Sequence, residues 1–395
     1  MADGNGTGKR RELWLDVLRV AAACAVVMMH TLTGAVDIFN VSGHAYGKLM
    51  LIIMDLVTWC VPVFLMISGY LFLKPGKEIP FQTMVGKYCL RIVLALLVFG
   101  IPFSCLELIL AEKTFRFGMI WDGFLMVLTW KSWSHLWYLY LILSLYLLTP
   151  AIAWILKKVP VWSVAAAECV LVVGGSVFPW LNQVWSGAGL PVLPEQIWSG
   201  AGLSVLPEQI GNGGQLPALP DQAIYLFYYL FGYLLHAEGI KKIKKQYKGL
   251  TACTVALVLG MIVYRLSDAR QIQMAYNYPP TVMLAVSFMM LGRMIDKAKE
   301  VCRVENGDAR EQTSRMSKEP QKLTEKLILN LSQLSFGIYL VHPVFLNIFY
   351  KFLHVTPAAG NFALRFPLFF AVTFLAAAGT AWMMRKISLL RRYVL

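Results

Sequence analysis

The residues of this sequence best suited to chemistry are Asp16, Arg19 and His30, which interrupt the apolar stretch LWLDVLRVAAACAVVMMHTLTG. A histidine, with its near-neutral pKa, is the usual side chain for general acid–base catalysis. On a helix, Arg19 and His30 fall within about 20° on one face and about 16 Å apart along the axis. Asp16 lies one turn before Arg19 and can form an ion pair with it. One helix face therefore connects a basic group to a distant imidazole.

Two interpretations of these residues have to be weighed. An arginine near the end of a membrane helix can extend its charge to the interface, which would make Arg19 only an anchor. His30 lies deeper and cannot do so as easily, and ionisable residues inside membrane helices usually mark functional sites. Their position on one stripe favours function.

The composition indicates an integral membrane protein. Of 395 residues, 58% are hydrophobic and 15% charged, and the mean hydropathy is +0.60. Soluble domains are richer in charge and poorer in apolar residues. The net charge of +14 is spread over short loops with no contiguous basic face, which argues against nucleic-acid binding.

Six of the seven cysteines lie in apolar spans and none forms a CxxC pair, so we expect neither disulfides nor a metal site.

Apolar runs of membrane-spanning length predict an all-α fold with about ten transmembrane helices. The expected spans are 13–35, 49–73, 88–110, 135–156, 161–178, 222–237, 250–266, 278–295, 327–351 and 362–384. Lys and Arg concentrate in alternate loops, and the positive-inside rule then places both termini in the cytoplasm. We expect cytoplasmic tails at 1–12 and 385–395 around a membrane domain at 13–384.

Two loops differ from the rest. The external loop 179–221 holds a tandem repeat over 185–210, WSGAGLPVLPEQI followed by WSGAGLSVLPEQI. Two short copies do not make a solenoid, and a duplication tolerated in a surface loop is favoured over a substrate-grasping element. The segment 296–326 mixes both charge signs and predicts a solvated, partly disordered cytoplasmic connector.

Four segments carry a resemblance to a known family. LDVLRVAAACAVVMMH resembles the first-helix signature of the acyltransferase-3 family of bacterial membrane O-acyltransferases, a basic residue followed after ten residues by histidine. WCVPVFLMISGYLFLKP, SHLWYLYLILSLYLLTP and LSFGIYLVHP are similar to three more of its segments, in the same order. The resemblance extends from Leu13 to Met384 and is closest to surface-glycan acetyltransferases such as those of enterobacterial common antigen. One departure is that Tyr88, beside Lys87, replaces the first arginine of an Arg-x-x-Arg pair whose second is Arg91.

The resemblance implies an enzyme of the bacterial cytoplasmic membrane. It would transfer an acetyl or other acyl group from cytoplasmic acyl-CoA to a hydroxyl of a surface glycan or lipid-linked sugar outside, without a metal or prosthetic group. His30 would act as general base or would carry the acyl group itself, and these alternatives stay open.

The predicted topology divides the candidate site residues by depth. The catalytic candidates are His30, Arg19 and Asp16. A mainly basic cytoplasmic group is expected to bind the donor, and an imidazole-rich outer group to bind the acceptor. The donor candidates are Lys87, Arg91, Ser68, Tyr70 and Arg293, and the acceptor candidates are His342, Tyr339, His135 and Trp137.

Simpler roles compete with three of these assignments. Ser68 is favoured as a helix-packing residue beside Gly69. Trp137 fits an interfacial aromatic belt as well as a sugar-stacking site, and His342 fits a satisfied core histidine equally well. For the whole chain, the main alternative is a transporter or exporter of a small amphipathic solute or glycolipid. A sensor or scaffold is disfavoured, and a homo-oligomer is left open.

Overall fold

The computed structural model describes residues 12–39, 46–181, 219–236, 243–267, 275–305 and 318–395, and all regular structure in them is helical. The tandem repeat at 185–210 and nearly all of the N-terminal tail lie outside the described residues. The helices are α1 (Leu13–Phe39), α2 (Gly47–Val57), α3 (Cys60–Phe72), α4 (Phe81–Thr83), η2 (Met84–Cys89), α5 (Leu90–Ala95), η3 (Leu96–Gly100), α6 (Ile101–Glu112), α7 (Gly118–Leu128), η4 (Ser134–Leu136), α8 (Trp137–Lys158), α9 (Val161–Val172), η5 (Val173–Val177), α12 (Leu219–Leu234), α13 (Ile243–Ser267), α14 (Pro279–Glu305), α15 (Lys318–Asn347), η7 (Ile348–Phe352), α16 (Phe362–Lys386) and α17 (Ser388–Tyr393).

Eight helices among the described residues are long and apolar enough to cross a membrane. They are Leu13–Val36, Gly47–Phe72, Phe81–Glu112, Ser134–Lys158, Val161–Leu181, Lys248–Leu266, Leu323–Phe352 and Phe362–Lys386, and they correspond to eight of the ten expected spans. The chain is therefore an all-α, multi-pass membrane protein.

The two other expected spans, 222–237 and 278–295, correspond to weaker helices. The first contains an apolar helix only over Ala223–Leu234, and the second lies in α14, whose latter half is charged. A further apolar helix, α7, was not expected, because its 11 residues are too short to span a bilayer. Both ends of the 296–326 connector are helical, since α14 continues to Glu305 and α15 begins at Lys318.

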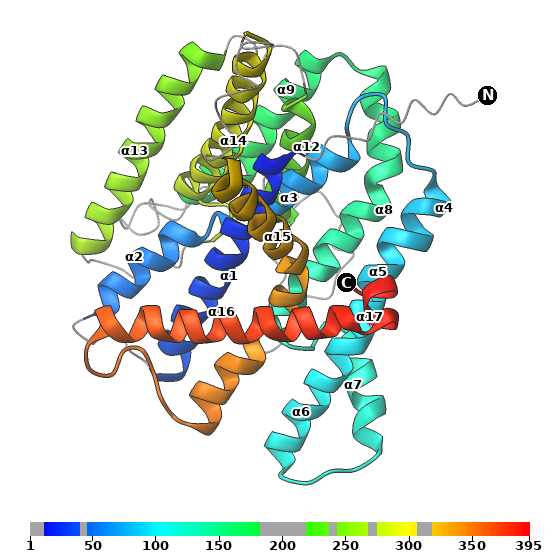
Figure 1. Cartoon of the computed structure of the whole chain (residues 1–395), viewed down its shortest axis with the longest axis vertical. Helices are drawn as coiled ribbons and strands as arrows, with labels where there is room; N and C mark the ends of the chain where they lie inside the picture. The colour runs from blue at the N-terminus through cyan, green and yellow to red at the C-terminus, as the bar shows by residue number, and fades with distance from the viewer. Residues whose placement is uncertain (1–11, 40–45, 182–218, 237–242, 268–274, 306–317) are drawn as a thin grey trace.

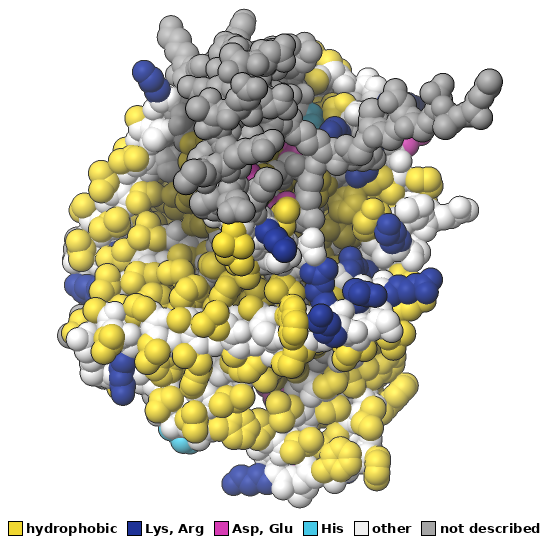
Figure 2. All heavy atoms as spheres, in the orientation of Figure 1, with side chains coloured by type: hydrophobic (Ala, Val, Ile, Leu, Met, Phe, Trp, Pro, Cys, Tyr) yellow, Lys and Arg dark blue, Asp and Glu magenta, His cyan; other side chains and the backbone are white. Residues whose placement is uncertain are grey.

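The centre of the bundle is built around α1, which contacts α2, α3, α14, α15 and α16. In Figure 1, α16 crosses in front of α1 and α15, and α6 and α7 project together as a hairpin. Much of the outer surface is apolar, as Figure 2 shows, with Lys and Arg gathered on one side of this face. Such a surface is expected where lipid replaces water as the solvent.

Two glycines allow α3 and α12 to pack closely. A Cβ added at Gly69 would lie 1.8 Å from the Tyr229 carbonyl oxygen, and one at Gly232 would lie 2.3 Å from that of Met66. Small residues at membrane helix crossings permit this approach of backbones. Ser68, adjacent to Gly69, lines a cavity.

Candidate active site

A cavity of about 330 Å³ lies along α1 and contains both Arg19 and His30 in its wall. Its lining is mainly apolar and aromatic, and among the described residues that line it the only charged side chains are those of two arginines. The lining residues are Arg19, Val26, His30, Val61, Phe64, Ile67, Ser68, Leu71, Phe72, Tyr88, Arg91, Ile92, His135, Trp137, Tyr138, Ile142, Tyr146, Tyr276, Ser335, Phe336, Tyr339 and Leu395. Arg19, Val26 and His30 of α1 thus face one continuous space.

Three imidazoles from separate elements meet at one end of this cavity. His30 comes from α1, His135 from the short turn η4, and His342 from α15. The ring centroids of His30 and His342 are 4.9 Å apart, and those of His135 and His342 are 5.9 Å apart. His342 is fully buried behind the other two and does not line the cavity. These rings do not converge as a metal site, and no set of three or more His, Cys, Asp or Glu residues in the described part does so.

The hydrogen bonds of the histidines leave the same nitrogen available on each ring. Nδ1 of His30 lies 2.9 Å from the Val26 carbonyl oxygen, so it carries the proton and donates. Nδ1 of His342 likewise faces the carbonyls of Ile338 and Tyr339, at 3.1 and 2.9 Å. Nε2 of each ring is therefore a lone-pair acceptor, and within the described residues Nε2 of His342 has no hydrogen-bond partner. At His30 this acceptor is the atom that a general base requires.

Arg19 is held at the other end by Asp16. Arg19 Nη1 lies 3.2 Å from Asp16 Oδ1, which also accepts a 2.5 Å hydrogen bond from Ser332 Oγ of α15. The Asp16 side chain has no exposed surface and does not line the cavity, whereas the Arg19 side chain is 25% exposed. Asp16 is therefore placed to orient Arg19 rather than to contact a ligand. Ser332 was not predicted, although it shares a stripe of α15 with Ser335 and Tyr339.

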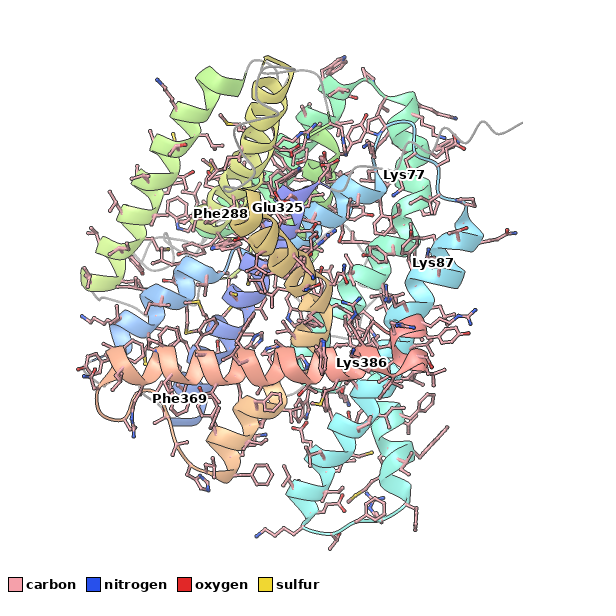
Figure 3. The ribbon with its side chains drawn as sticks, in the orientation of Figure 1. Lys77, Lys87, Phe288, Glu325, Phe369 and Lys386 are labelled. Atoms are coloured by element: carbon pink, nitrogen blue, oxygen red, sulfur yellow. The ribbon has the colours of Figure 1, made fainter. Side chains whose placement is uncertain are left out.

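Arg91 lines the same cavity as Arg19, and Tyr146, a third lining residue, interacts electrostatically with both. Arg91 Nε donates to the Val394 carbonyl oxygen at 3.1 Å, and Leu395 also lines this end of the cavity. Tyr88, which stands where the family pattern has its first arginine, lines the cavity too. Lys87 is exposed, with Nζ 5.5 Å from the centre of the Tyr88 ring, and Figure 3 shows it projecting from the edge of the molecule.

Tyr70 and Arg293 lie outside the cavity wall and belong to a separate cluster around Glu12. The Tyr70 hydroxyl donates to Glu12 Oε2 at 2.7 Å, and the Arg293 guanidinium lies 5.8 Å from the centre of the Tyr70 ring. His236 stacks on the other side of Tyr70, with ring centroids 3.9 Å apart. The cluster ties α1, α3, the end of α12 and α14 together.

The structure brings most predicted site residues together. Those lining one cavity are Arg19, His30, Ser68, Arg91, His135, Trp137 and Tyr339, and those outside its wall are Asp16, Tyr70, Lys87, Arg293 and His342. Tyr339 donates its hydroxyl hydrogen to the carbonyl oxygen of His135, which fixes the turn bearing that histidine. The arginines at one end of the cavity can hold an anionic group, and the imidazoles about 16 Å away along α1 can move a proton.

Comparison with known proteins gives one match. The profile of a family described as an acyltransferase domain matches residues 12–384, almost the whole chain. No curated protein and no solved structure matches.

Proposed function

The chain belongs to the acyltransferase-3 family and is a membrane acyltransferase, and from this premise we propose that it transfers an acyl group, acetyl by default, from acyl-CoA to a sugar hydroxyl. The acceptor would be a surface glycan or a lipid-linked sugar outside the cytoplasmic membrane. The observation that carries the proposal is the single cavity with Arg19 at one end and His30 at the other.

The arginine end suits the donor. Arg19 and Arg91 are the charged side chains of the cavity wall, and guanidinium groups bind phosphates through paired hydrogen bonds. The apolar wall between them and His30 suits an extended thioester arm. In this proposal Arg91 exchanges its bond to the Val394 carbonyl for a donor phosphate.

The imidazole end suits the transfer. Since Nδ1 of His30 donates to Val26, Nε2 can take the proton of the acceptor hydroxyl as its oxygen attacks the thioester carbonyl. The carbon–sulfur bond then breaks, and the imidazolium returns the proton to the leaving thiolate. In the nucleophilic version Nε2 itself attacks the thioester carbonyl and CoA leaves as its thiolate. In a second step the sugar hydroxyl attacks the acyl-imidazolium, the nitrogen–acyl bond breaks, and the hydroxyl proton passes to the thiolate.

The proposed topology has ten crossings and both termini in the cytoplasm. Contacts between loops support it, because segments assigned to the same side touch one another. Lys157 pairs with Glu78, and Lys74 with Glu12, between segments assigned to the cytoplasm. At the opposite end Lys48 Nζ donates to the Leu266 carbonyl oxygen. Arg19 then lies near the cytoplasm and His30 in the outer half of the membrane.

Membrane vesicles of defined orientation test this proposal. Inside-out vesicles from cells producing the protein, given radiolabelled acetyl-CoA, should place ester-linked label on glycan, while right-side-out vesicles should not. Vesicles carrying Arg19→Ala should lose the labelling, and those carrying Arg116→Ala, a change of an exposed arginine, should keep it. Absence of label in every vesicle, with protein-dependent movement of an unmodified solute, would instead establish the transporter alternative.

A further inference from the structure

The imidazole end of the cavity has an aromatic wall that the transfer step does not use. The Trp137 indole lies 5.3 Å from the Tyr276 ring and 5.6 Å from the Tyr225 ring, measured between centroids. Trp137 and Tyr276 line the cavity and are only partly buried, whereas Tyr225 is buried and absent from the lining. Two of the three rings therefore present surface to whatever occupies the cavity.

Tyr276 is fixed in place by groups distant in the sequence. It lies in the short segment before α14, and its carbonyl oxygen accepts a 2.6 Å hydrogen bond from the hydroxyl of Tyr228, a fully buried residue of α12. Its own hydroxyl lies 3.9 Å from the sulfur of Met29, the residue preceding His30. The ring is thus held against α1 at the residue next to His30 in the sequence, and Tyr276 and His30 both line the cavity.

His135 supplies a polar atom at the same place. Its side chain lines the cavity and is almost fully buried, and Nε2 has no hydrogen-bond partner within the described residues. The His135 ring also interacts with the backbone of Leu340, and in the neutral imidazole whose proton is on the other nitrogen, Nε2 is a lone-pair acceptor. A buried acceptor without a partner is costly, and a ligand that donates a hydrogen bond would remove the cost.

The aromatic wall and the imidazole acceptor favour a ligand with an uncharged ring that carries hydroxyl groups. An aromatic surface binds the apolar C–H face of a ring, and imidazole acceptors bind O–H groups at its edge. The charged side chains of the cavity wall, Arg19 and Arg91, lie at the other end. We propose that Tyr276 and Trp137 form the wall on which the pyranose ring of the acceptor stacks, with His135 Nε2 accepting a second hydroxyl of that ring. The acceptor role of this site rests on the proposed function, whereas its affinity for a sugar can be measured separately.

The sugar affinity is measured by saturation-transfer NMR on the full chain in detergent micelles, with a panel of methyl hexopyranosides as probes. At least one probe should bind the wild type. Tyr276→Ala should weaken that binding about tenfold or more, whereas Tyr276→Phe, which keeps the ring, should bind like the wild type. Matching thermal unfolding of the two variants shows that the fold is retained. Failure of every probe to bind, or equal binding by Tyr276→Ala, overturns the proposal.

Steady-state acyl transfer separates this inference from the proposed function. In Tyr276→Ala the KM for the sugar should rise about tenfold and the KM for acyl-CoA should not change. If the KM for acyl-CoA rises instead, the wall binds the donor's acyl chain and the assignment is wrong. If sugar binding depends on Tyr276 but the wild type transfers no acyl group, the sugar site stands and the proposed function fails.

Discussion

Among the described residues, two Asp–Arg pairs lie within candidate membrane spans, and they differ in geometry and in exposure. Asp55 of α2 and Arg265 of α13 form two hydrogen bonds of 2.7 and 3.1 Å, and their side chains are 2% and 5% exposed. Asp16 and Arg19 of α1 form one contact of 3.2 Å, and the arginine opens onto the cavity.

The difference predicts which pair should stabilise the fold and which should serve a ligand. Asp55 and Arg265 share two hydrogen bonds and do not line the cavity, so their charges compensate each other and are not available to a substrate. In the second pair the buried carboxylate is shared with Ser332, and the guanidinium keeps surface in the cavity. Asp55 and Arg265 should therefore control stability, and Asp16 and Arg19 should control donor use.

The largest effect is expected from Arg265→Met. The change leaves the Asp55 carboxylate buried without its partner, which typically costs about 3–5 kcal/mol of unfolding free energy. Chemical unfolding of the purified protein in detergent measures this loss. The double variant Asp55→Leu/Arg265→Met should recover most of it, because no buried charge remains. A single variant as stable as the wild type would show that the pair is not structural.

Arg19→Met should cost less unfolding free energy than Arg265→Met, because the buried Asp16 carboxylate keeps its hydrogen bond from Ser332, and it should reduce kcat/KM for acyl-CoA about 10- to 100-fold. The reason is the loss of a charge-assisted hydrogen bond to the donor, worth about 1.5–3 kcal/mol. Steady-state kinetics with varied acyl-CoA measures it, with Arg116→Met as the matched control at an exposed arginine. A loss of stability as large as that of Arg265→Met would remove the distinction between the pairs.

A smaller effect is expected from Asp16→Asn. The amide oxygen can still accept from Ser332, but the orientation of Arg19 weakens with the lost charge. The KM for acyl-CoA should rise about three- to tenfold while kcat stays close to the wild-type value. An equal fall in kcat would indicate instead that Asp16 acts on the transfer step.

The smallest effect is expected at the exposed pair Glu78–Lys157, whose atoms are 2.5 Å apart. The hydrogen bond and charge of Lys157 lower the pKa of Glu78 below its ordinary value of 4.5, so the pair stabilises the fold above that pH and loses this contribution as the pH falls through the lowered pKa. Unfolding of Glu78→Gln should differ only slightly from the wild type at pH 7, and the difference should vanish in acid. A difference that grows in acid would contradict this sign.

The sequence could predict those features that follow from the residue pattern of one helix, such as its length and which residues share a face. Periodicity placed Arg19 and His30 on one face. The apolar runs predicted about ten membrane helices, of which eight are found among the described residues, and the loop charges predicted that the imidazoles lie apart from the arginines. The pair Asp55–Arg265 could not be found this way, because it joins two helices whose packing no local pattern encodes. Tyr276 was missed for a related reason, since its position depends on a hydrogen bond from Tyr228.

Grouping the candidate residues by their expected depth in the membrane also placed together residues that the fold separates. Tyr70 and Arg293 were placed with the donor candidates, yet they surround Glu12 instead of lining the cavity. Lys87 was also predicted to bind the donor, but it is exposed while its neighbour Tyr88 lines the wall. Residues at the same depth can face opposite sides of their helices, which a topology cannot resolve.

The central claim is that His30 performs the transfer, and acyl transfer by His30→Asn tests it most directly. Asparagine keeps a polar side chain but cannot act as a base, so the rate should fall about 100- to 10,000-fold with acyl-CoA binding unchanged. His354→Asn is the matched control, because His354 is exposed and its positive φ suits asparagine. A His30→Asn protein that transfers acyl groups within threefold of the wild-type rate would contradict the account.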